Sequence, residues 1–66
     1  MKITLNGEDR TLEEDTTIEA FMRELQLDPR KVAIEHNLAI VPCSEYSETY
    51  INDGDILEVV QFIGGG

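Results

Sequence analysis

The sequence predicts an α+β domain in which one main helix crosses one face of a mixed sheet of four to five strands. One segment carries apolar residues at helical spacing, and shorter segments with strand-like patterns lie before and after it. Sixty-six residues suffice for one domain with a modest core, and 41% of them are hydrophobic. We therefore expect a chain that folds, around a core too small to enclose a deep catalytic cleft.

The chain is expected to begin with a hairpin. Three apolar residues alternate with polar ones, which is typical of a strand with one buried face: Met1, Ile3 and Leu5. Asn6-Gly7 follows, the dipeptide that best tolerates the positive φ angles of a two-residue turn. Residues 8–13 then return as a second strand, whose register is weakly determined because only Leu12 is clearly apolar.

The helix is the strongest pattern in the chain. Four apolar residues at positions i, i+3, i+4 and i+7 share one helical face: Ile18, Phe21, Met22 and Leu25. Thr16 and Thr17 are both competent N-caps, and Thr16 has Glu19 at the capping-box spacing. We expect the segment to close at Asp28-Pro29, because a residue before proline is disfavoured in the helical region. The apolar stripe predicts a core face and no cofactor contact.

The second half of the chain is expected to complete the sheet. Residues 32–35 and 40–41 predict two short strands. The polar stretch 44–52 predicts an irregular loop or short helical turn with three anchoring side chains: Tyr46, Tyr50 and Ile51. Asp53-Gly54-Asp55 predicts a turn. The nearly continuous apolar run 56–63 is typical of an interior strand covered on much of both faces.

This order of elements matches the β-grasp arrangement of ubiquitin-like proteins. A lone helix between two pairs of strands crosses one face of a mixed sheet in that arrangement. We expect residues 1–63 to form the β-grasp domain and residues 64–66 to form a flexible C-terminal glycine tail.

The charge of the chain argues against several classes of partner. Fourteen acidic residues against five basic ones give a net charge of −9, which repels phosphate backbones and anionic headgroups. Nucleic acid and membrane surfaces are therefore poor candidates, whereas a basic groove on another protein is complementary. The charge could also serve solubility alone. Without a signal core or an apolar run of membrane-spanning length, we expect a cytoplasmic protein.

Few residues are candidates for catalysis or metal binding. Cys43 is the only cysteine, so no internal disulfide forms, and one cysteine with His36 cannot make a structural zinc site. His36 is expected at the surface or rim, on the opposite strand face from Glu35. Cys43 is expected to be an exposed, inert thiol, because no basic residue lies close to it in the chain. We predict no catalytic residue and no metal site.

The remaining candidate is the segment Gly64-Gly65-Gly66. An arm without side chains can thread a narrow channel in another protein and reach a bound nucleotide. There the carboxylate of Gly66 would attack the α-phosphate of ATP and become an acyl-adenylate. A side chain at the last two positions would block that approach, so the chemistry needs glycine. Alternatively, the three glycines are a frayed end of the domain or residues left over from an expression tag or linker.

Five segments spread over the whole chain carry a resemblance to a known family: residues 1–7 (MKITLNG), Thr17-Ile18, Ile40-Val41-Pro42, Asp53-Gly54-Asp55 and residues 61–66 (QFIGGG). Together they resemble the sulfur-carrier family of thiamine biosynthesis (ThiS), whose members are ubiquitin-like β-grasp proteins. The family often has Asn-Gly where this chain has Asn37-Leu38, and often has arginine where this chain has Cys43.

The resemblance implies a protein carrier and co-substrate, with no enzymatic activity of its own. An adenylating enzyme related to ubiquitin-activating enzymes would bind ATP and convert the Gly66 carboxylate to an acyl-adenylate. Sulfur from a donor such as a cysteine desulfurase would displace AMP and leave a thiocarboxylate on Gly66. Thiazole synthase would then take this sulfur into the thiazole ring of thiamine. Gly64 and Gly65 would thread the partner's active site, Phe62 and Ile63 are candidate partner contacts, and the chain would bind no cofactor.

Two other kinds of function stay open. The same tail could deliver sulfur to molybdopterin or to a tRNA, or could be conjugated to protein lysines as a ubiquitin-like modifier. In the other class, the chain would be a non-covalent acidic interaction module, for which the glycines are incidental.

Overall fold

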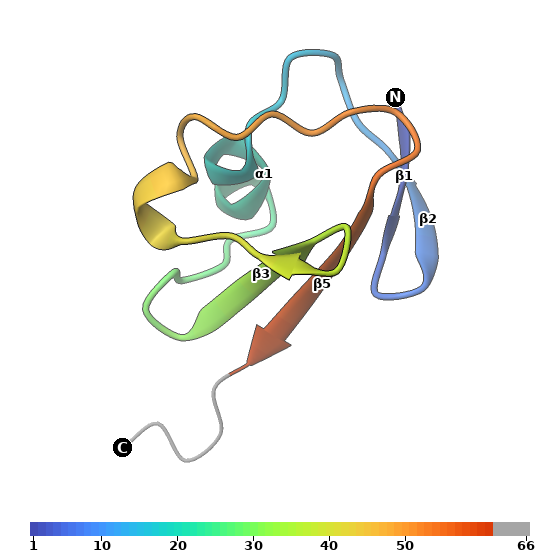
Figure 1. The fold of residues 1–66 in the computed structure, drawn as a ribbon. Helices are drawn as coiled ribbons and strands as arrows, with labels where there is room; N and C mark the ends of the chain where they lie inside the picture. Colours follow the sequence, from blue (N-terminus) through green and yellow to red (C-terminus); the bar gives the residue numbers. More distant parts are fainter. Residues whose placement is uncertain (62–66) are drawn as a thin grey trace.

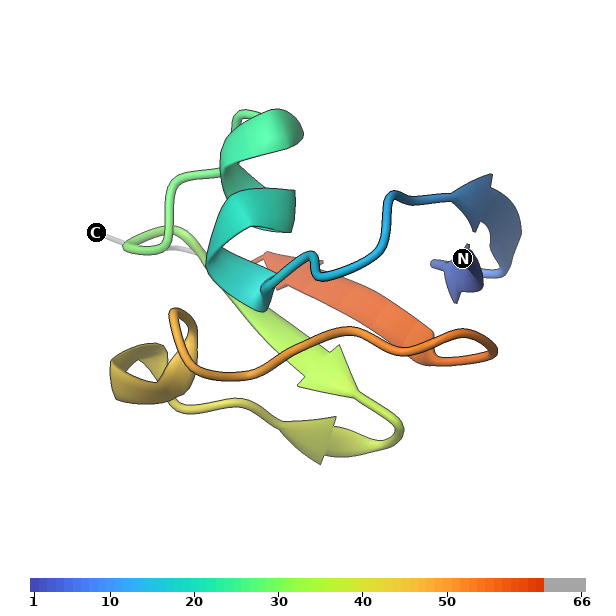
Figure 2. The same ribbon diagram turned by 90° about the horizontal axis from the view of Figure 1, so that it is seen from above.

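The structure is a computed structural model and describes residues 1–61. Five strands form one mixed sheet in the order β2-β1-β5-β3-β4. Their bounds are β1 Lys2–Leu5, β2 Glu8–Thr11, β3 Val32–His36, β4 Ala39–Ile40 and β5 Ile56–Gln61. β1 and β5 run parallel, and the other neighbouring strands are antiparallel. The helix α1 (Ile18–Glu24) lies across one face of the sheet (Figures 1 and 2), which confirms the predicted β-grasp architecture.

The helix begins one residue later than the capping-box spacing indicates. Thr17 is the N-cap, in extended conformation, and its hydroxyl accepts a hydrogen bond from the backbone N of Ala20 at 3.1 Å. The Thr16 hydroxyl instead donates to the carbonyl of Glu13 at 2.8 Å. The capping box that would pair Thr16 with Glu19 is therefore not formed.

The helix also ends before the predicted proline stop. Gln26 adopts a left-handed conformation with φ 59° directly after the C-cap, Leu25. The backbone N of Leu27 then donates to the carbonyl of Met22, and the backbone N of Gln26 donates to that of Arg23. This pair of bonds is a Schellman motif, which satisfies the last carbonyls of a helix. The local backbone turn therefore ends α1, several residues ahead of Pro29.

The core lies between α1 and the sheet. Its buried apolar side chains come from the helix, from β1, β3 and β5, and from the loops: Ile3, Leu5, Leu12, Ile18, Phe21, Met22, Val32, Ile34, Val41, Tyr46, Ile51 and Leu57. The predicted helical stripe is confirmed, with Leu25 partly buried against this cluster. Tyr46 and Ile51 are buried as expected, but Tyr50 is 54% exposed. Tyr50 contributes through its backbone, which forms an isolated bridge to Thr17.

Two-residue turns close both hairpins of the sheet. Asn6 and Gly7 have φ angles of 49° and 82° between β1 and β2, as the sequence predicts. Asn37 and Leu38 have φ angles of 51° and 75° between β3 and β4. Leu38 thus occupies a left-handed position that disfavours a residue with a Cβ, and its side chain is 87% exposed.

Several element boundaries differ from the predicted ones. β2 ends at Thr11, and all of its residues are exposed, because it is an edge strand with no covering element. β3 extends to His36, and β4 is Ala39–Ile40 since Val41 turns into the core. A 3₁₀ helix, η1 (Cys43–Glu45), begins the loop that leads to β5 and matches the expected short helical turn.

β5 is an interior strand, as predicted, between β1 and β3. The expectation that it is covered on much of both faces is wrong. Leu57 is buried on the α1 side, whereas Ile56 and Val60 are 49% and 42% exposed on the other side. Among the described elements α1 is the only α-helix, and it covers one face of the sheet. The apolar run therefore combines a core face with an uncovered apolar face.

Candidate functional site

The candidate site begins where β5 ends, because the predicted reactive tail follows that strand in the chain. Gln61, the last described residue, pairs with Val32 of β3. Since β1 and β5 run parallel, the end of β5 lies at the opposite end of the sheet from Met1 (Figure 1). The sheet thus presents the root of the tail at one end of the molecule.

The residues predicted to react or to contact partners lie outside the described residues: Phe62, Ile63, Gly64, Gly65 and Gly66. The structure describes the strand that precedes these residues, β5, and the surface around that strand.

Two asparagine side chains extend the hydrogen bonding of β5. Asn6 Oδ1 accepts from the backbone N of Val59 at 2.9 Å, just past the end of β1. Asn37 Oδ1 accepts from the backbone N of Ile56 at 2.8 Å. Both asparagines have positive φ angles in the two hairpin turns. The residues that close the hairpins therefore also hold β5 along its length.

Asp55 is a buried carboxylate immediately before β5. Its Oδ2 lies 2.6 Å from His36 Nε2 and accepts from the backbone N of Asn52 at 2.8 Å, while its Oδ1 accepts from Asn37 Nδ2 at 3.1 Å. Burial alone would raise the pKa of Asp55, but the hydrogen bonds from His36, Asn52 and Asn37 outweigh burial and hold that pKa below its usual value. The carboxylate thus joins the β3–β4 turn to the turn before β5.

His36 lies at the rim, as expected, and Asp55 is its partner. The sequence analysis did not bring these two residues together. A signal was present, because His36 ends β3 and Asp55 precedes its antiparallel neighbour β5, so both lie at the same end of the sheet. Asp55 also accepts hydrogen bonds from Asn37 and from the backbone N of Asn52, so we interpret the His36–Asp55 pair as structural.

Comparison with known proteins identifies the family. The family model described as the ThiS family matches residues 3–66. The chain belongs to the ThiS family. A crystal structure of a thiamine biosynthesis protein (ThiS) from Geobacter metallireducens superimposes with a TM-score of 0.89 at 28% identity, and each chain is covered completely.

Two relatives place the ThiS-family chain in different contexts. "Sulfur carrier protein ThiS" of Bacillus subtilis is 37% identical over 65 residues, which cover 97% of this chain and 98% of that protein. A protein of Paramagnetospirillum magneticum named "Thiazole synthase" is 54% identical over 66 residues, which cover all of this chain but only 20% of that protein. The chain thus spans a fifth of the length of this second relative.

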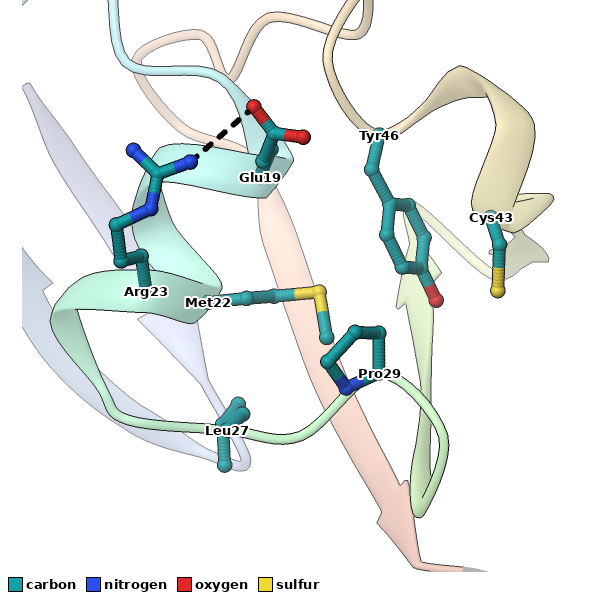
Figure 3. A pocket seen from close by; sticks show the side chains of 7 residues that line it. All are labelled: Glu19, Met22, Arg23, Leu27, Pro29, Cys43 and Tyr46. Atoms are coloured by element: carbon teal, nitrogen blue, oxygen red, sulfur yellow. Dashed lines mark hydrogen bonds and ion pairs between the residues drawn. The ribbon is translucent and has the colours of Figure 1, made fainter.

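A shallow groove between α1 and η1 carries the cysteine of this ThiS-family chain (Figure 3). Its lining is Glu19, Met22, Arg23, Leu27, Pro29, Cys43 and Tyr46. Cys43 is exposed, as predicted. Burial raises the pKa of Tyr46, and the neighbouring Cys43 side chain adds to the rise. Within residues 1–61, no basic side chain is hydrogen-bonded to the Cys43 thiol. That this thiol is inert stays a prediction.

Across residues 1–61, no three His, Cys, Asp or Glu side chains come together in a way that could hold a metal ion. Over the same residues, no helix has the length and apolar character needed to cross a membrane.

Proposed function

We propose that this chain is a sulfur carrier of thiamine biosynthesis whose reactive group is the carboxylate of Gly66. The family match that extends to residue 66 carries this proposal, because it includes all three glycines of the tail. A relative of nearly the same length, from Bacillus subtilis, is named a sulfur carrier protein. The chain would act as a carrier and co-substrate, with no catalytic group of its own.

The proposed chemistry takes place in partner proteins. An adenylating enzyme related to ubiquitin-activating enzymes binds ATP, and a Gly66 carboxylate oxygen attacks the α-phosphorus while pyrophosphate leaves. A persulfide sulfur, supplied by a donor such as a cysteine desulfurase, then attacks the acyl carbon and AMP leaves, which gives an acyl disulfide. A thiol, as the two-electron reductant, then attacks the donor's sulfur, forms a disulfide with it and releases the acyl sulfur. The product is a thiocarboxylate on Gly66. Gly64 and Gly65 thread the partner's channel, where side chains would collide with its walls.

Thiazole synthase is the proposed acceptor of the sulfur. The Paramagnetospirillum magneticum protein of that name contains a segment 54% identical to the whole of this chain, within a polypeptide of five times the matched length. Joining two modules in one polypeptide raises their effective concentration, which is useful when they act on one another. This observation favours thiazole formation over the other sulfur acceptors.

The described geometry supports the carrier role through the position of β5. The strand is paired on both sides and is further bonded by Asn6 and Asn37. A strand held in this way gives the tail a fixed point of origin. A partner that binds the domain can therefore place the tail reproducibly, as catalysis by orientation requires.

Intact mass spectrometry tests the proposal. The protein is incubated with ATP, the activating enzyme of the same organism, a cysteine desulfurase, cysteine and a thiol reductant. A carrier gains the mass difference of one oxygen replaced by sulfur, a modifier appears attached to other proteins, and an interaction module shows neither change. The untreated mass also reports whether Gly66 ends the chain, which the proposal requires.

Variants of the tail locate the reacting group in an ATP–pyrophosphate exchange assay. One residue added after Gly66 should abolish exchange, because the carboxylate moves by about 3.5 Å and carries a side chain. Gly65→Ala should impair exchange, while Glu48→Gln, on an exposed loop position, should leave it nearly unchanged. Full exchange by the extended chain would refute the assignment of Gly66.

A further inference from the structure

A groove on the α1 side of the sheet lies beside the end of β5. Its volume is about 520 Å³, and its lining comes from the β1–β2 hairpin, from β5 and from the end of α1. The lining residues include Asn6, Arg10, Leu25, Leu27, Val59 and Gln61. Because Gln61 is the last described residue, the segment 62–66 starts at this groove. We call it the tail-side groove.

The tail-side groove exists because β5 extends past β1 at this end of the sheet. The parallel ladder between the two strands ends with Leu5 and Leu57, and the chain then turns at Asn6 into β2. The Asn6 side chain accepts the backbone N of Val59. Among residues 1–61, no strand pairs with β5 on this side beyond that bond. A short stretch of polypeptide can therefore lie in the groove.

Arg10 gives the tail-side groove a positive charge, in a chain whose net charge is −9. Arg10 lies on the α1 side of β2, because it is the cross-strand partner of the buried Ile3. The described lining of the groove holds no acidic residue. Within residues 1–61, Arg10 forms no ion pair, whereas Arg23 and Arg30 each have a carboxylate partner. The groove therefore offers a cation to an anion that can reach it.

The end of the chain is an anion tethered beside this cation. In the proposed function, Gly66 ends in a free carboxylate, and residues 62–66 join it to Gln61 at the groove. Five residues span at most about 17 Å when extended, so the segment is long enough to turn back over the groove. The three glycines permit that turn, because glycine adopts positive φ angles without strain. A short tether also gives the carboxylate a high effective concentration at Arg10.

We propose that Arg10 binds the end of the tail: its guanidinium pairs with the Gly66 carboxylate in the tail-side groove while no partner protein holds the tail. This inference rests on the proposed function, which requires Gly66 to end the chain. A guanidinium can donate to both oxygens of a carboxylate, and a thiocarboxylate carries the same charge, so the sulfur-loaded tail pairs in the same way. Arg10 is exposed, and an exposed ion pair favours the paired tail by only about 1.5-fold to fivefold. A partner therefore displaces the tail readily, and the contact adds little to the stability of the domain.

Nuclear magnetic resonance of the ¹⁵N-labelled chain, without any partner, tests the inference. Arg10→Gln should lower the heteronuclear NOE of the Gly64 and Gly65 amides, because the carboxylate is released. A chain assembled by chemical ligation with a C-terminal amide on Gly66 should show the same decrease and should shift the Arg10 Nε–H signal. Combining the two changes should add nothing further, since both remove one contact. Sodium chloride at about 0.5 M should reproduce most of the decrease in the original chain.

Lys2→Gln is the matched control, because it removes the same charge from an exposed position at the opposite end of the sheet and should leave the glycine signals unchanged. Equal NOE values in the original chain, in Arg10→Gln and in the amide chain would overturn the inference. A decrease with Lys31→Gln, which removes the cation just before β3, in place of Arg10→Gln would overturn the choice of Arg10.

Other occupants of the tail-side groove give a different result. If the Arg10 Nε–H signal responded to added acetate or phosphate but not to the amide on Gly66, the groove would bind another anion and the tail would not be its occupant. Intact mass reports separately on the proposed function. A chain that continues past Gly66 would overturn both proposals, whereas a chain that ends there and gains no sulfur would refute the carrier function alone.

Discussion

Replacing Asp55 with alanine should remove a large part of the stability of this domain. The substitution leaves the backbone N of Asn52, His36 Nε2 and Asn37 Nδ2 without their shared acceptor. A buried donor left unsatisfied costs about 1–3 kcal/mol, and the two side chains, which can turn toward water, add less. We expect a total loss of about 2–4 kcal/mol, against about 3–10 kcal/mol for a whole domain of this size.

Thermal and urea unfolding followed by circular dichroism at neutral pH measure this loss. The expected decrease in melting temperature is roughly 10–30 °C. Asp53→Ala is the control. Asp53 Oδ1 accepts a hydrogen bond from the backbone N of Lys2 at 2.6 Å, but this bond is exposed, so water can replace the lost carboxylate. If Asp55→Ala unfolded at the same temperature as Asp53→Ala, the network around Asp55 would not stabilise the fold as we argue.

The pH dependence of the stabilisation by Asp55 follows from the direction of its pKa shift. The pKa of Asp55 is lower in the folded chain than its usual value of 3.8, so the unfolded chain binds the proton more readily. The stabilisation is therefore complete above that usual value and is lost as the pH falls through the lower folded pKa. The difference in unfolding free energy between the original chain and Asp55→Asn should shrink as the pH falls from the usual value of 3.8 through the lower folded pKa. A difference independent of pH would show that the carboxylate charge is not involved.

Four further predictions concern the turns, the thiol and the tail. Leu38→Gly should raise stability by about 1 kcal/mol in thermal unfolding. Glycine removes the Cβ that strains the left-handed backbone at this position, and the exposed leucine side chain gives up no buried contact; an unchanged melting temperature would argue against backbone strain at Leu38. Asn6→Ala should destabilise more than Asn6→Gly, since both lose the bond to β5 but only alanine is strained at φ 49°. Cys43→Ser should leave thiocarboxylate formation intact; loss of the mass gain would make the thiol a relay nucleophile. Deleting Gly65 and Gly66 should shift the melting temperature by less than about 4 °C, and a larger fall would mean that the tail is docked.

The parts of the fold that local pattern determines were predictable. The helical stripe, the Asn6-Gly7 turn and the Gly54 turn depend on residues close in sequence, and the structure confirms each of them. The end of α1 was not predictable in the same way. A left-handed Gln26 carries no compositional signal, because glycine or asparagine is the usual residue there.

The missed features depend on contacts between residues distant in sequence. The His36–Asp55 pair requires the register of β3 against β5, which residue patterns alone left undetermined. The apolar run of β5 indicated burial on both faces, because hydrophobicity alone does not distinguish a core face from an exposed apolar face. The glycine tail is a prediction from composition and position, and it lies outside the described residues.

The position of β5 between two partner strands has a mechanical consequence. A pull applied beyond Gln61 acts along the axis of β5, while the hydrogen bonds to β1 and β3 lie across that axis. The hydrogen bonds that join β5 to β1 and to β3 are then loaded in shear. Many of these hydrogen bonds must break together instead of opening one after another. Asn6 and Asn37 add two more bonds of the same orientation. The domain can therefore stay folded when the segment that follows β5 is pulled.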